Sequence, residues 1–176
     1  SFFNNLDPKT ILVAISHVNN QSGVIQPVEE FSQRLKQIKS KAKVHIDATQ
    51  SFSKLSISLM NQCIDYMTVS SHKLGGPKGI AGIYVKKDVA IKPLLYGGGQ
   101  EKNLRSSTQS FPLISSFTRA VQEGIDSLEF EYKKVQDINN KIRQSLEKSI
   151  TGVLFPFSNT DKCNVSPYIL TFVVPN

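Results

Sequence analysis

Short apolar runs rich in β-branched residues recur along the first half of the chain, at residues 10–16, 44–46, 66–70 and 80–86. Runs of this length are typical of strands, and the first has the composition of a strand buried on both faces. Between the first two runs, Pro27 precedes apolar residues spaced three and four apart, which predicts a helix with one buried face. Strand, helix and strand in succession predict an α/β fold with a mostly parallel sheet.

A long helical pattern fills much of the second half of the chain. It opens at Pro112 and repeats apolar residues every three or four positions from Phe117 to Leu146, with a kink expected near Gly124. We assign residues 1–150 to a large unit that ends in this linking helix. The apolar stretches 153–155 and 169–174 are interpreted as strands of a smaller unit at residues 151–176, which is too short to hold its own core.

Composition limits the partners that this chain is expected to have. Its 176 residues carry a net charge of +7, but the basic residues are scattered and no run of five occurs. We therefore expect a solvated surface and an anionic cofactor rather than a nucleic-acid partner. No apolar stretch approaches the roughly 20 residues that a membrane helix needs, so no membrane partner is expected.

The two cysteines, Cys63 and Cys163, lie far apart and show no paired spacing. This argues against a disulfide framework and against a metal site such as zinc, and it fits a reducing compartment, so we expect a cytoplasmic protein. The N-terminus does not read as a signal peptide. It also lacks a starting Met, which suggests that the chain begins inside a longer gene product.

Polar residues with chemical potential follow the predicted strands, where ligands bind in parallel sheets. They are Asn20, Asp47, Gln50, Ser70, His72 and Lys73. Pyridoxal phosphate requires an amine for a Schiff base, a carboxylate for its ring nitrogen and donors for its phosphate. Lys73, which enters the glycine-rich turn 75–79, and Asp47 supply the first two. The sequence therefore predicts a pyridoxal phosphate enzyme in which Lys73 is catalytic.

Each of these residues also has a structural alternative. Asp47 at a strand end can cap a turn or helix, and Asn20 can form a turn. His72 can make a structural hydrogen bond, and Lys73 can be an ordinary surface lysine. His45 lies within a strand and is interpreted as a core residue.

The motifs together resemble one enzyme family. They are His17-Val18-Asn19-Asn20, His45-Ile46-Asp47-Ala48-Thr49-Gln50, Ser70-Ser71-His72-Lys73, Gly75-Gly76-Pro77-Lys78-Gly79, Gly97-Gly98-Gly99-Gln100-Glu101 and Arg105-Ser106-Ser107-Thr108. In this order they resemble the NifS/IscS-type cysteine desulfurases of the class V aminotransferase superfamily, over residues of about 10–123. The resemblance implies the aspartate aminotransferase-like fold (fold type I) of pyridoxal phosphate-dependent transferases.

The resemblance also implies roles for individual residues. Lys73 would form the Schiff base and shuttle the Cα proton, and Asp47 would pair with the pyridinium nitrogen. Gln50 would donate to the phenolic oxygen, and Ser70 with His72 would hold the phosphate. The remaining two assignments are Asn20, near the cofactor oxygen and the substrate carboxylate, and Thr108, which would reach the phosphate of a neighbouring subunit. That last contact implies a homodimer with a shared active site, and Arg105 would support it or anchor its loop.

The implied reaction converts L-cysteine to L-alanine and an enzyme persulfide, for iron–sulfur cluster assembly or tRNA thiolation through sulfur-acceptor scaffold proteins. The family carries this sulfur on a downstream cysteine loop, and an arginine for the substrate carboxylate follows later. Neither Cys63 nor Cys163 matches that loop, so we expect a central fragment that is inactive in isolation.

Three residues depart from the family pattern: Gln21, Ser71 and Ser107. None of them removes a group that the chemistry needs. Another class V enzyme, such as a selenocysteine lyase or a small aminotransferase, is the first alternative function. A non-catalytic scaffold fragment is the second.

Overall fold

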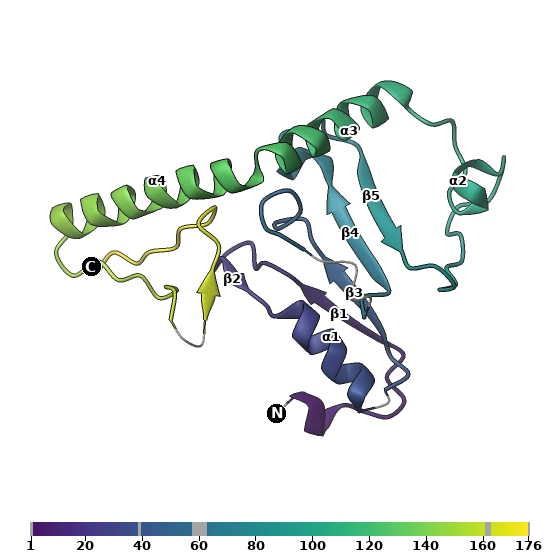
Figure 1. Cartoon of the computed structure of the whole chain (residues 1–176), viewed down its shortest axis with the longest axis horizontal. Helices are drawn as coiled ribbons and strands as arrows, with labels where there is room; N and C mark the ends of the chain where they lie inside the picture. Colours follow the sequence, from purple (N-terminus) through teal and green to yellow (C-terminus); the bar gives the residue numbers. More distant parts are fainter. Residues whose placement is uncertain (1, 39, 58–62, 161–162, 176) are drawn as a thin grey trace.

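A four-stranded sheet forms the centre of the computed structural model, which describes residues 2–38, 40–57, 63–160 and 163–175 (Figure 1). The strands, in spatial order, are β1 (Leu12–Ser16), β3 (Lys43–Asp47), β4 (Tyr66–Ser70) and β5 (Ala81–Val85). The pairs β1–β3 and β3–β4 are parallel, whereas β4–β5 is antiparallel. The prediction of four strands in a mostly parallel sheet is confirmed.

Helix α1 (Val28–Gln37) packs on this sheet through the apolar residues that the sequence pattern singled out. Val28 and Leu35 share one buried cluster with Val13, Val44 and Ile46. Pro27 lies at the N-cap position, where its missing N–H costs no helical hydrogen bond. A short 3-10 helix, η1 (Phe2–Asn5), places the ring of Phe3 5.0 Å from that of Phe31.

Strand β1 is not buried on both faces, contrary to the expectation from its composition. Val13 is 8% exposed, but Leu12 is 50% exposed. The physical reason is that successive side chains of a strand point to opposite faces: Val13 joins the buried cluster with α1, whereas Leu12 and Ala14 lie on the other face and are exposed.

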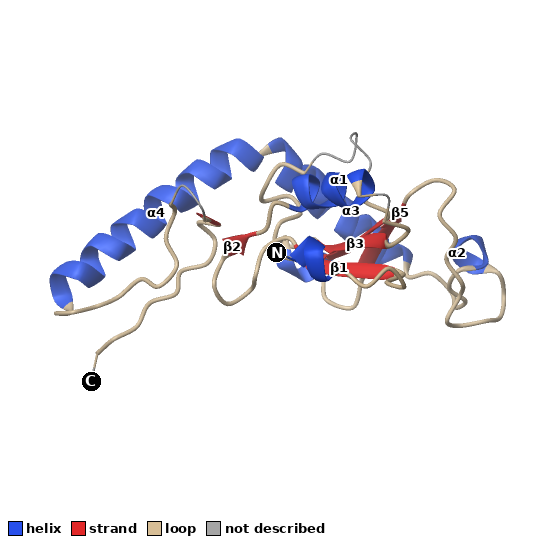
Figure 2. Ribbon diagram, turned by 90° about the horizontal axis from the view of Figure 1, so that it is seen from below, coloured by secondary structure: helices blue, strands red, loops and turns tan. Residues whose placement is uncertain are grey.

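The long helical pattern forms two helices, α3 (Phe111–Asp126) and α4 (Leu128–Ser149), that follow one another almost directly. The break lies at Ser127 rather than near Gly124. The Ser127 hydroxyl donates a hydrogen bond to the carbonyl oxygen of Glu123 at 2.7 Å. Such a bond from a serine side chain back to the preceding turn favours a bend in the helix at this point. In two views at right angles, α4 extends away from the sheet (Figures 1 and 2).

The segment after residue 150 does not form the strands that were expected. Residues 153–155 and 169–174 contribute a single bridge, between Leu154 and Val173. The paired strand is instead β6 (Asn164–Val165), which is antiparallel to β2 (Val24–Ile25). Val165 is 7% exposed, because it pairs with Val24 in β2 and lies against Gly23. Burial of this side chain explains where the segment docks. Figures 1 and 2 show the segment running beside α4.

Two short elements complete the description, η2 (Ser71–Lys73) directly after β4 and α2 (Gln100–Asn103). Helix α2 contains positive φ angles at Glu101 and Lys102 and lies at the end of the molecule farthest from α4 in both ribbon views. Among the helices of the described residues, none combines the length and the apolar character that crossing a membrane requires.

Candidate active site

The predicted site residues follow the carboxyl ends of adjacent parallel strands. Ser16 is in register with Asp47 across β1 and β3, and Asp47 is in register with Thr68 across β3 and β4. Neighbouring strands lie about 4.8 Å apart. The turns that carry Asn20, Gln50 and Lys73 therefore all leave the same edge of the sheet, the one formed by the carboxyl ends of its parallel strands.

Asp47 lies at this edge with a fixed orientation. Its Oδ1 accepts a hydrogen bond from the Thr49 backbone N–H at 2.9 Å, and its backbone carbonyl accepts one from His17 N–H at 2.9 Å. The carboxylate is exposed. The turn-capping alternative for Asp47 is thus present in the structure. It uses one carboxylate oxygen and leaves the negative charge available to a ligand.

Ser70 and His72 form a hydroxyl–imidazole pair at the end of β4. Ser70 Oγ and His72 Nδ1 lie 2.9 Å apart, so His72 does make the structural hydrogen bond that was considered. The bond engages one ring nitrogen. The side chain of His72 is exposed, and its other nitrogen is the one that an anion beside η2 would meet.

Lys73 ends η2 and is exposed at the start of the glycine-rich turn. The turn closes through hydrogen bonds from Leu74 N–H and Gly76 N–H to the Ser71 carbonyl, both 3.1 Å. Gly75 has a φ of +88°, a conformation that side chains other than glycine rarely adopt. A Cβ at Gly76 would lie 2.2 Å from Ser71 Oγ, so this turn requires a glycine for close packing.

The asparagine pair after β1 divides its roles. Asn19 forms the turn, because its Oδ1 accepts hydrogen bonds from Gln21 N–H at 3.0 Å and Ser22 N–H at 2.9 Å. Asn20 is exposed beside it, which leaves its amide at the surface of the candidate site. Gln50 lies half-buried in the turn that follows β3.

Thr108 is not brought together with these residues. It is exposed in the loop between α2 and α3, which projects beyond β5 (Figure 1). Arg105 in the same loop donates a hydrogen bond to the Ser106 carbonyl, and its backbone forms a bridge with Leu95. These contacts show Arg105 as an anchor of its own loop.

The residues at this edge fit pyridoxal phosphate by their chemistry. An exposed amine, an exposed carboxylate and a hydroxyl–imidazole pair complement an aldehyde, a basic ring nitrogen and a phosphate. In addition, the close-packed turn at Gly76 lets the backbone approach a ligand beside Lys73. Elsewhere in the ranges that the structure describes, no group of three or more His, Cys, Asp or Glu side chains is placed to hold a metal ion.

Sequence reasoning missed Lys54, which lies in the same turn as Gln50. Its ammonium lies 5.5 Å from the centre of the Tyr168 ring. Burial lowers the pKa of Lys54 below its ordinary value, and the positive charge of Lys73 lowers it further. The only signal in the sequence is its position, four residues after Gln50.

His17 is a second residue with an unusual environment. It is 7% exposed, and its Nδ1 is buried and has no hydrogen-bond partner among the residues that the structure describes. Burial lowers the pKa of His17, and the nearby charge of Glu29 opposes this only in part. The imidazole borders an apolar groove of about 430 Å³ with Ile25, Leu55 and Tyr132. The lowered pKa favours the neutral form of the His17 imidazole.

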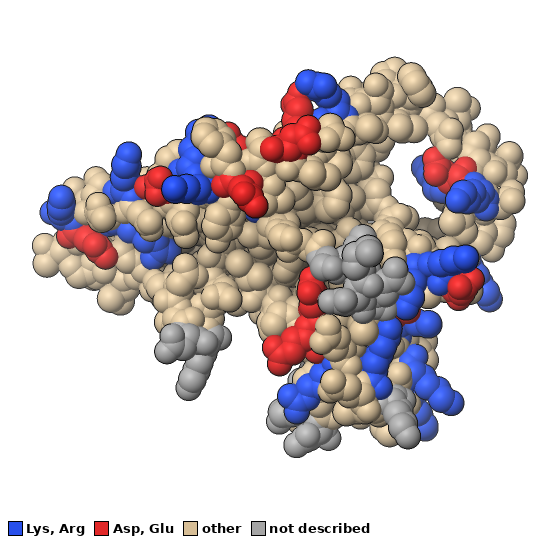
Figure 3. Space-filling model, viewed as in Figure 1, with Lys and Arg blue, Asp and Glu red and all other residues tan. Residues whose placement is uncertain are grey.

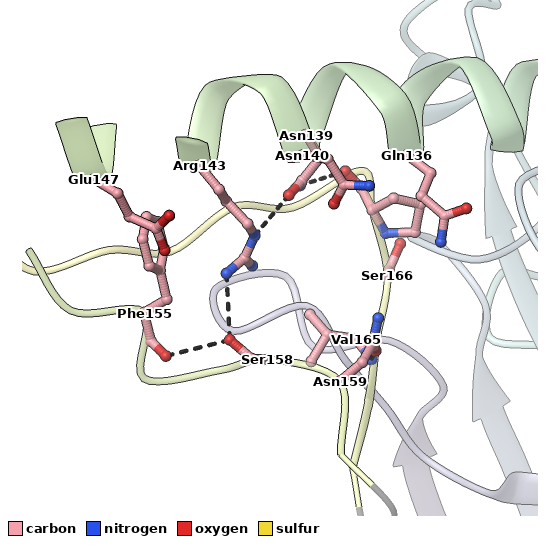
Figure 4. A pocket seen from close by; sticks show the side chains of 11 residues that line it. Gln136, Asn139, Asn140, Arg143, Glu147, Phe155, Ser158, Asn159, Val165 and Ser166 are labelled. Carbon is pink, nitrogen blue, oxygen red and sulfur yellow. Dashed lines mark hydrogen bonds between the residues drawn. The ribbon is translucent and has the colours of Figure 1, made fainter. Parts of the chain in front are cut away.

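A polar cavity of about 330 Å³ lies between α4 and the C-terminal segment, away from Lys73 (Figure 4). Its central side chain, Arg143, donates to Asn139 Oδ1 at 2.8 Å, to Ser158 Oγ at 3.3 Å and to the Phe157 carbonyl at 3.3 Å. Because the guanidinium is already used by these protein oxygens, we interpret the cavity as a structural junction.

Figure 3 shows where charge gathers on one face of the molecule. Lys and Arg side chains gather at the lower right of this view, the region where Figure 1 places α1 and the start of β3.

The comparisons with known proteins agree with this arrangement. The family model described as "Aminotransferase class-V" matches residues 1–175. The chain is 37% identical over 166 residues to the "Putative cysteine desulfurase IscS 1" of Bacillus subtilis (strain 168), covering 94% of this chain and 42% of the relative. It is 41% identical over 135 residues to the mitochondrial cysteine desulfurase of Saccharomyces cerevisiae, covering 74% of this chain and 27% of that protein.

Solved structures show the same similarity. A "NIFS-LIKE PROTEIN" superposes with a TM-score of 0.84 at 34% identity, over 93% of this chain and 44% of that one. The NifS-like protein from Rickettsia africae ESF-5 gives a TM-score of 0.84 at 30% identity, over 94% and 44% of the two chains. The chain therefore spans less than half the length of these relatives.

Proposed function

Because the chain belongs to the class V aminotransferase family, we propose that it is part of a pyridoxal phosphate-dependent cysteine desulfurase. The substrate would be L-cysteine, and the products would be L-alanine and an enzyme persulfide. The observation that carries the proposal is the set of an amine, a carboxylate and a hydroxyl–imidazole pair at one edge of the sheet. Relatives named cysteine desulfurase support the choice of substrate.

Lys73 and Asp47 would perform the central chemistry. When bound, pyridoxal phosphate supplies an electron sink for the Cα–H bond of an amino acid. Lys73 would bind the cofactor aldehyde and, once released by the substrate amine, take the Cα proton at Nζ. Asp47 would keep the ring nitrogen protonated, with its carboxylate held in place by Thr49 N–H.

The remaining residues would position the cofactor. Ser70 and His72 would bind its phosphate, and Gln50 would donate to its phenolic oxygen. Asn20 would contact the cofactor oxygen and the substrate carboxylate, a role that is open to it because Asn19 forms the turn.

Assembly and destination form a further part of the proposal. Thr108 would reach the phosphate of a second subunit in a homodimer, consistent with its exposed position on a projecting loop. Residues 1–150 would belong to the cofactor-binding large domain, and residues 151–176 would begin the small domain. The sulfur would pass through acceptor scaffold proteins to iron–sulfur cluster assembly or tRNA thiolation in the cytoplasm.

The two cysteines of this chain are not proposed as the sulfur carrier. Cys63 precedes β4 and Lys73 follows it, so the five residues of β4 separate them by roughly 15 Å or more. The backbone of Cys163 exchanges hydrogen bonds with that of Thr160, of 2.8 and 3.2 Å, which fixes its position.

We predict that the C63S/C163S double variant of the whole protein releases sulfide from L-cysteine at the wild-type rate, to within about 2-fold. Sulfide is measured in the presence of dithiothreitol, and cofactor content is measured in parallel. A rate reduced at least 10-fold at equal cofactor content would contradict this assignment.

The proposal is tested first on the bond between Lys73 and the cofactor. The protein is incubated with pyridoxal phosphate, reduced with borohydride, digested and analysed by mass spectrometry. We expect a phosphopyridoxyl group on Lys73, and none on that peptide after Lys73→Ala. Lys78→Ala, which removes an exposed lysine of the same turn, should leave the adduct unchanged. An unmodified Lys73 in protein that stays colourless would favour the non-catalytic alternative.

Substrate identity needs a second measurement on the whole protein. We expect L-cysteine to give equal amounts of alanine and sulfide. Transfer of the amino group to a 2-oxo acid instead would identify an aminotransferase. Turnover of L-selenocysteine without turnover of L-cysteine would identify a selenocysteine lyase.

A further inference from the structure

Helix α3 holds two turns of the site side by side. A Cβ at Gly124 would lie 2.8 Å from Cβ of Ser53, and a Cβ at Gly76 would lie 3.2 Å from Cβ of Ala120. Ala120 and Gly124 are one helical turn apart, which corresponds to about 6 Å along the helix. The turn after β3 and the turn after β4 are thus packed against neighbouring positions of one helix.

These two turns carry Lys54 and Lys73. Lys54 directly follows Ser53, and its backbone N–H donates to the Ser51 carbonyl at 3.0 Å, so its position relative to β3 is fixed. Burial lowers the pKa of Lys54, and the positive charge of Lys73 lowers it further, as expected for amines on adjacent turns. The two amines therefore belong to turns that α3 holds next to each other.

The surroundings of Lys54 leave its charge available. It is half-buried, and the ring of Tyr168 from the C-terminal segment covers one side of it at 5.5 Å. No ion pair joins Lys54 to a carboxylate within the residues that the structure describes. A cation in this setting favours an anionic ligand, because the anion offsets both the partial loss of water and the repulsion from Lys73.

We propose that Lys54 is a substrate-binding residue that contacts the α-carboxylate of the amino acid. The inference rests on the proposed function, in which the substrate amine replaces Lys73 on the cofactor. The substrate nitrogen then lies where Lys73 Nζ was, and its carboxylate carbon is only two bonds away. An ammonium beside Lys73 is therefore within reach of the carboxylate. Lys54 would act alongside the downstream arginine that the family resemblance implies.

The test compares two ligands that differ only in the carboxylate, L-alanine and ethylamine. Their dissociation constants for the protein reconstituted with pyridoxal phosphate are measured from the visible absorption of the cofactor. We expect Lys54→Met to weaken L-alanine about 10- to 100-fold, the range for one charge-assisted hydrogen bond. Ethylamine should change by less than about 2-fold, and Lys54→Arg should retain most of the affinity for L-alanine.

Controls separate this inference from the proposed function. Lys87→Met, at the opposite edge of the sheet, should leave both ligands unchanged. If Lys54→Met weakens both ligands equally, or neither, the carboxylate contact is wrong while the proposed function stands. If the wild-type protein shows no cofactor absorption and no response to L-alanine, the proposed function itself fails.

A second readout does not depend on the cofactor spectrum. Amine acetylation is followed at Lys54 by mass spectrometry, at a pH where exposed lysines react slowly. We expect L-alanine to slow the acetylation of Lys54 several-fold in the reconstituted protein, because a bound carboxylate stabilises the charged ammonium. Ethylamine should have no such effect. Equal protection by both ligands would contradict the proposal.

Discussion

Asp47 combines two functions at the end of β3. One carboxylate oxygen orders the turn through Thr49 N–H, and the net charge is the property that a pyridinium nitrogen would require. These two functions can be separated by substitution. An asparagine keeps an acceptor oxygen for the turn and removes only the charge.

We predict that Asp47→Asn still gives the adduct on Lys73 after borohydride reduction but slows Cα proton exchange at least about 100-fold. The measurement is the exchange of the Cα hydrogen of L-alanine for deuterium, followed by NMR. Asp88→Asn is a matched control, since Asp88 is exposed with a φ of +66°, which asparagine tolerates. Normal exchange in Asp47→Asn would exclude the charge as a requirement.

His17 predicts a pH dependence of stability. Its pKa is lowered in the folded protein from the ordinary value of 6.5, mainly by burial. Below pH 6.5 the unfolded chain binds a proton that the folded protein does not, so its contribution to the free energy of unfolding falls as the pH falls toward the folded pKa.

We expect the free energy of unfolding in urea to fall between about pH 7 and the pKa of His17 in the folded protein. We expect His17→Asn to reduce the slope of this free energy against pH. His45→Asn is the control, because that imidazole is half-buried and hydrogen-bonded to Thr68 Oγ1 at 3.2 Å. An unchanged slope in His17→Asn would assign the pH dependence to other groups.

At this scale the sequence located the chemical groups but not all of their contacts. The positions of Asp47, Ser70 and Lys73 at or just past strand ends could be predicted because motif and strand end coincide, while their roles stay predictions. Lys54 could not, because the residue that covers it, Tyr168, comes from far along the chain. The sequence also did not show that Asn19 forms the turn and Asn20 is left exposed, because the two side chains are identical.

Among the elements, α3 contacts two turns of the candidate site through small residues. It presents a glycine to Ser53, a residue with a φ of +58°, and an alanine to the glycine-rich turn. Small residues on one helix face thus set how closely two turns of the site can lie.

We predict that Gly124→Ala lowers the free energy of unfolding by roughly 1–3 kcal/mol, because overpacking against Ser53 exceeds the helix preference of about 1 kcal/mol for alanine. Urea denaturation measures the change. The double variant Ser53→Gly/Gly124→Ala should recover most of it, since glycine removes the clashing Cβ and suits the positive φ. Simple additivity of the two variants would show that the contact carries no energy.

Elements with a clear period were predictable and short pairings were not. The four strands and α1 follow from apolar spacing, and the Ser127 break lies only three residues from the expected kink. The pair β2–β6 involves two residues on each side, which is too short to give a period. The expected strands after residue 150 did not form, because residues 153–155 and 169–174 make only the Leu154–Val173 bridge and leave Leu154 62% and Val174 50% exposed.

At the scale of the whole molecule, the C-terminal segment is tied to α4 by a few polar contacts. Asn139 Nδ2 donates to the Pro167 carbonyl at 2.8 Å, and Arg143 binds Asn139, Ser158 and Phe157 (Figure 4). The guanidinium also lies 4.7 Å from the centre of the Phe155 ring. This junction keeps Tyr168 near Lys54.

We predict that Arg143→Leu destabilises the docking of this segment by about 1–3 kcal/mol, because the oxygens that it now binds lose a charged donor. Limited proteolysis should then cleave after residue 150 at a higher rate. Arg119→Leu is the control, because its pair with Glu123 at 2.6 Å is largely exposed, and it should cost less than about 1 kcal/mol. Equal proteolysis rates in the two variants would contradict the role of the junction.

The interruption at Ser127 has a mechanical consequence. Although α3 ends there and α4 begins one residue later, Ser127 N–H donates to the Glu123 carbonyl at 3.1 Å and the Ser127 carbonyl accepts from Glu131 N–H at 2.9 Å. Backbone hydrogen bonds therefore continue across the break and couple the arm formed by α4 to α3.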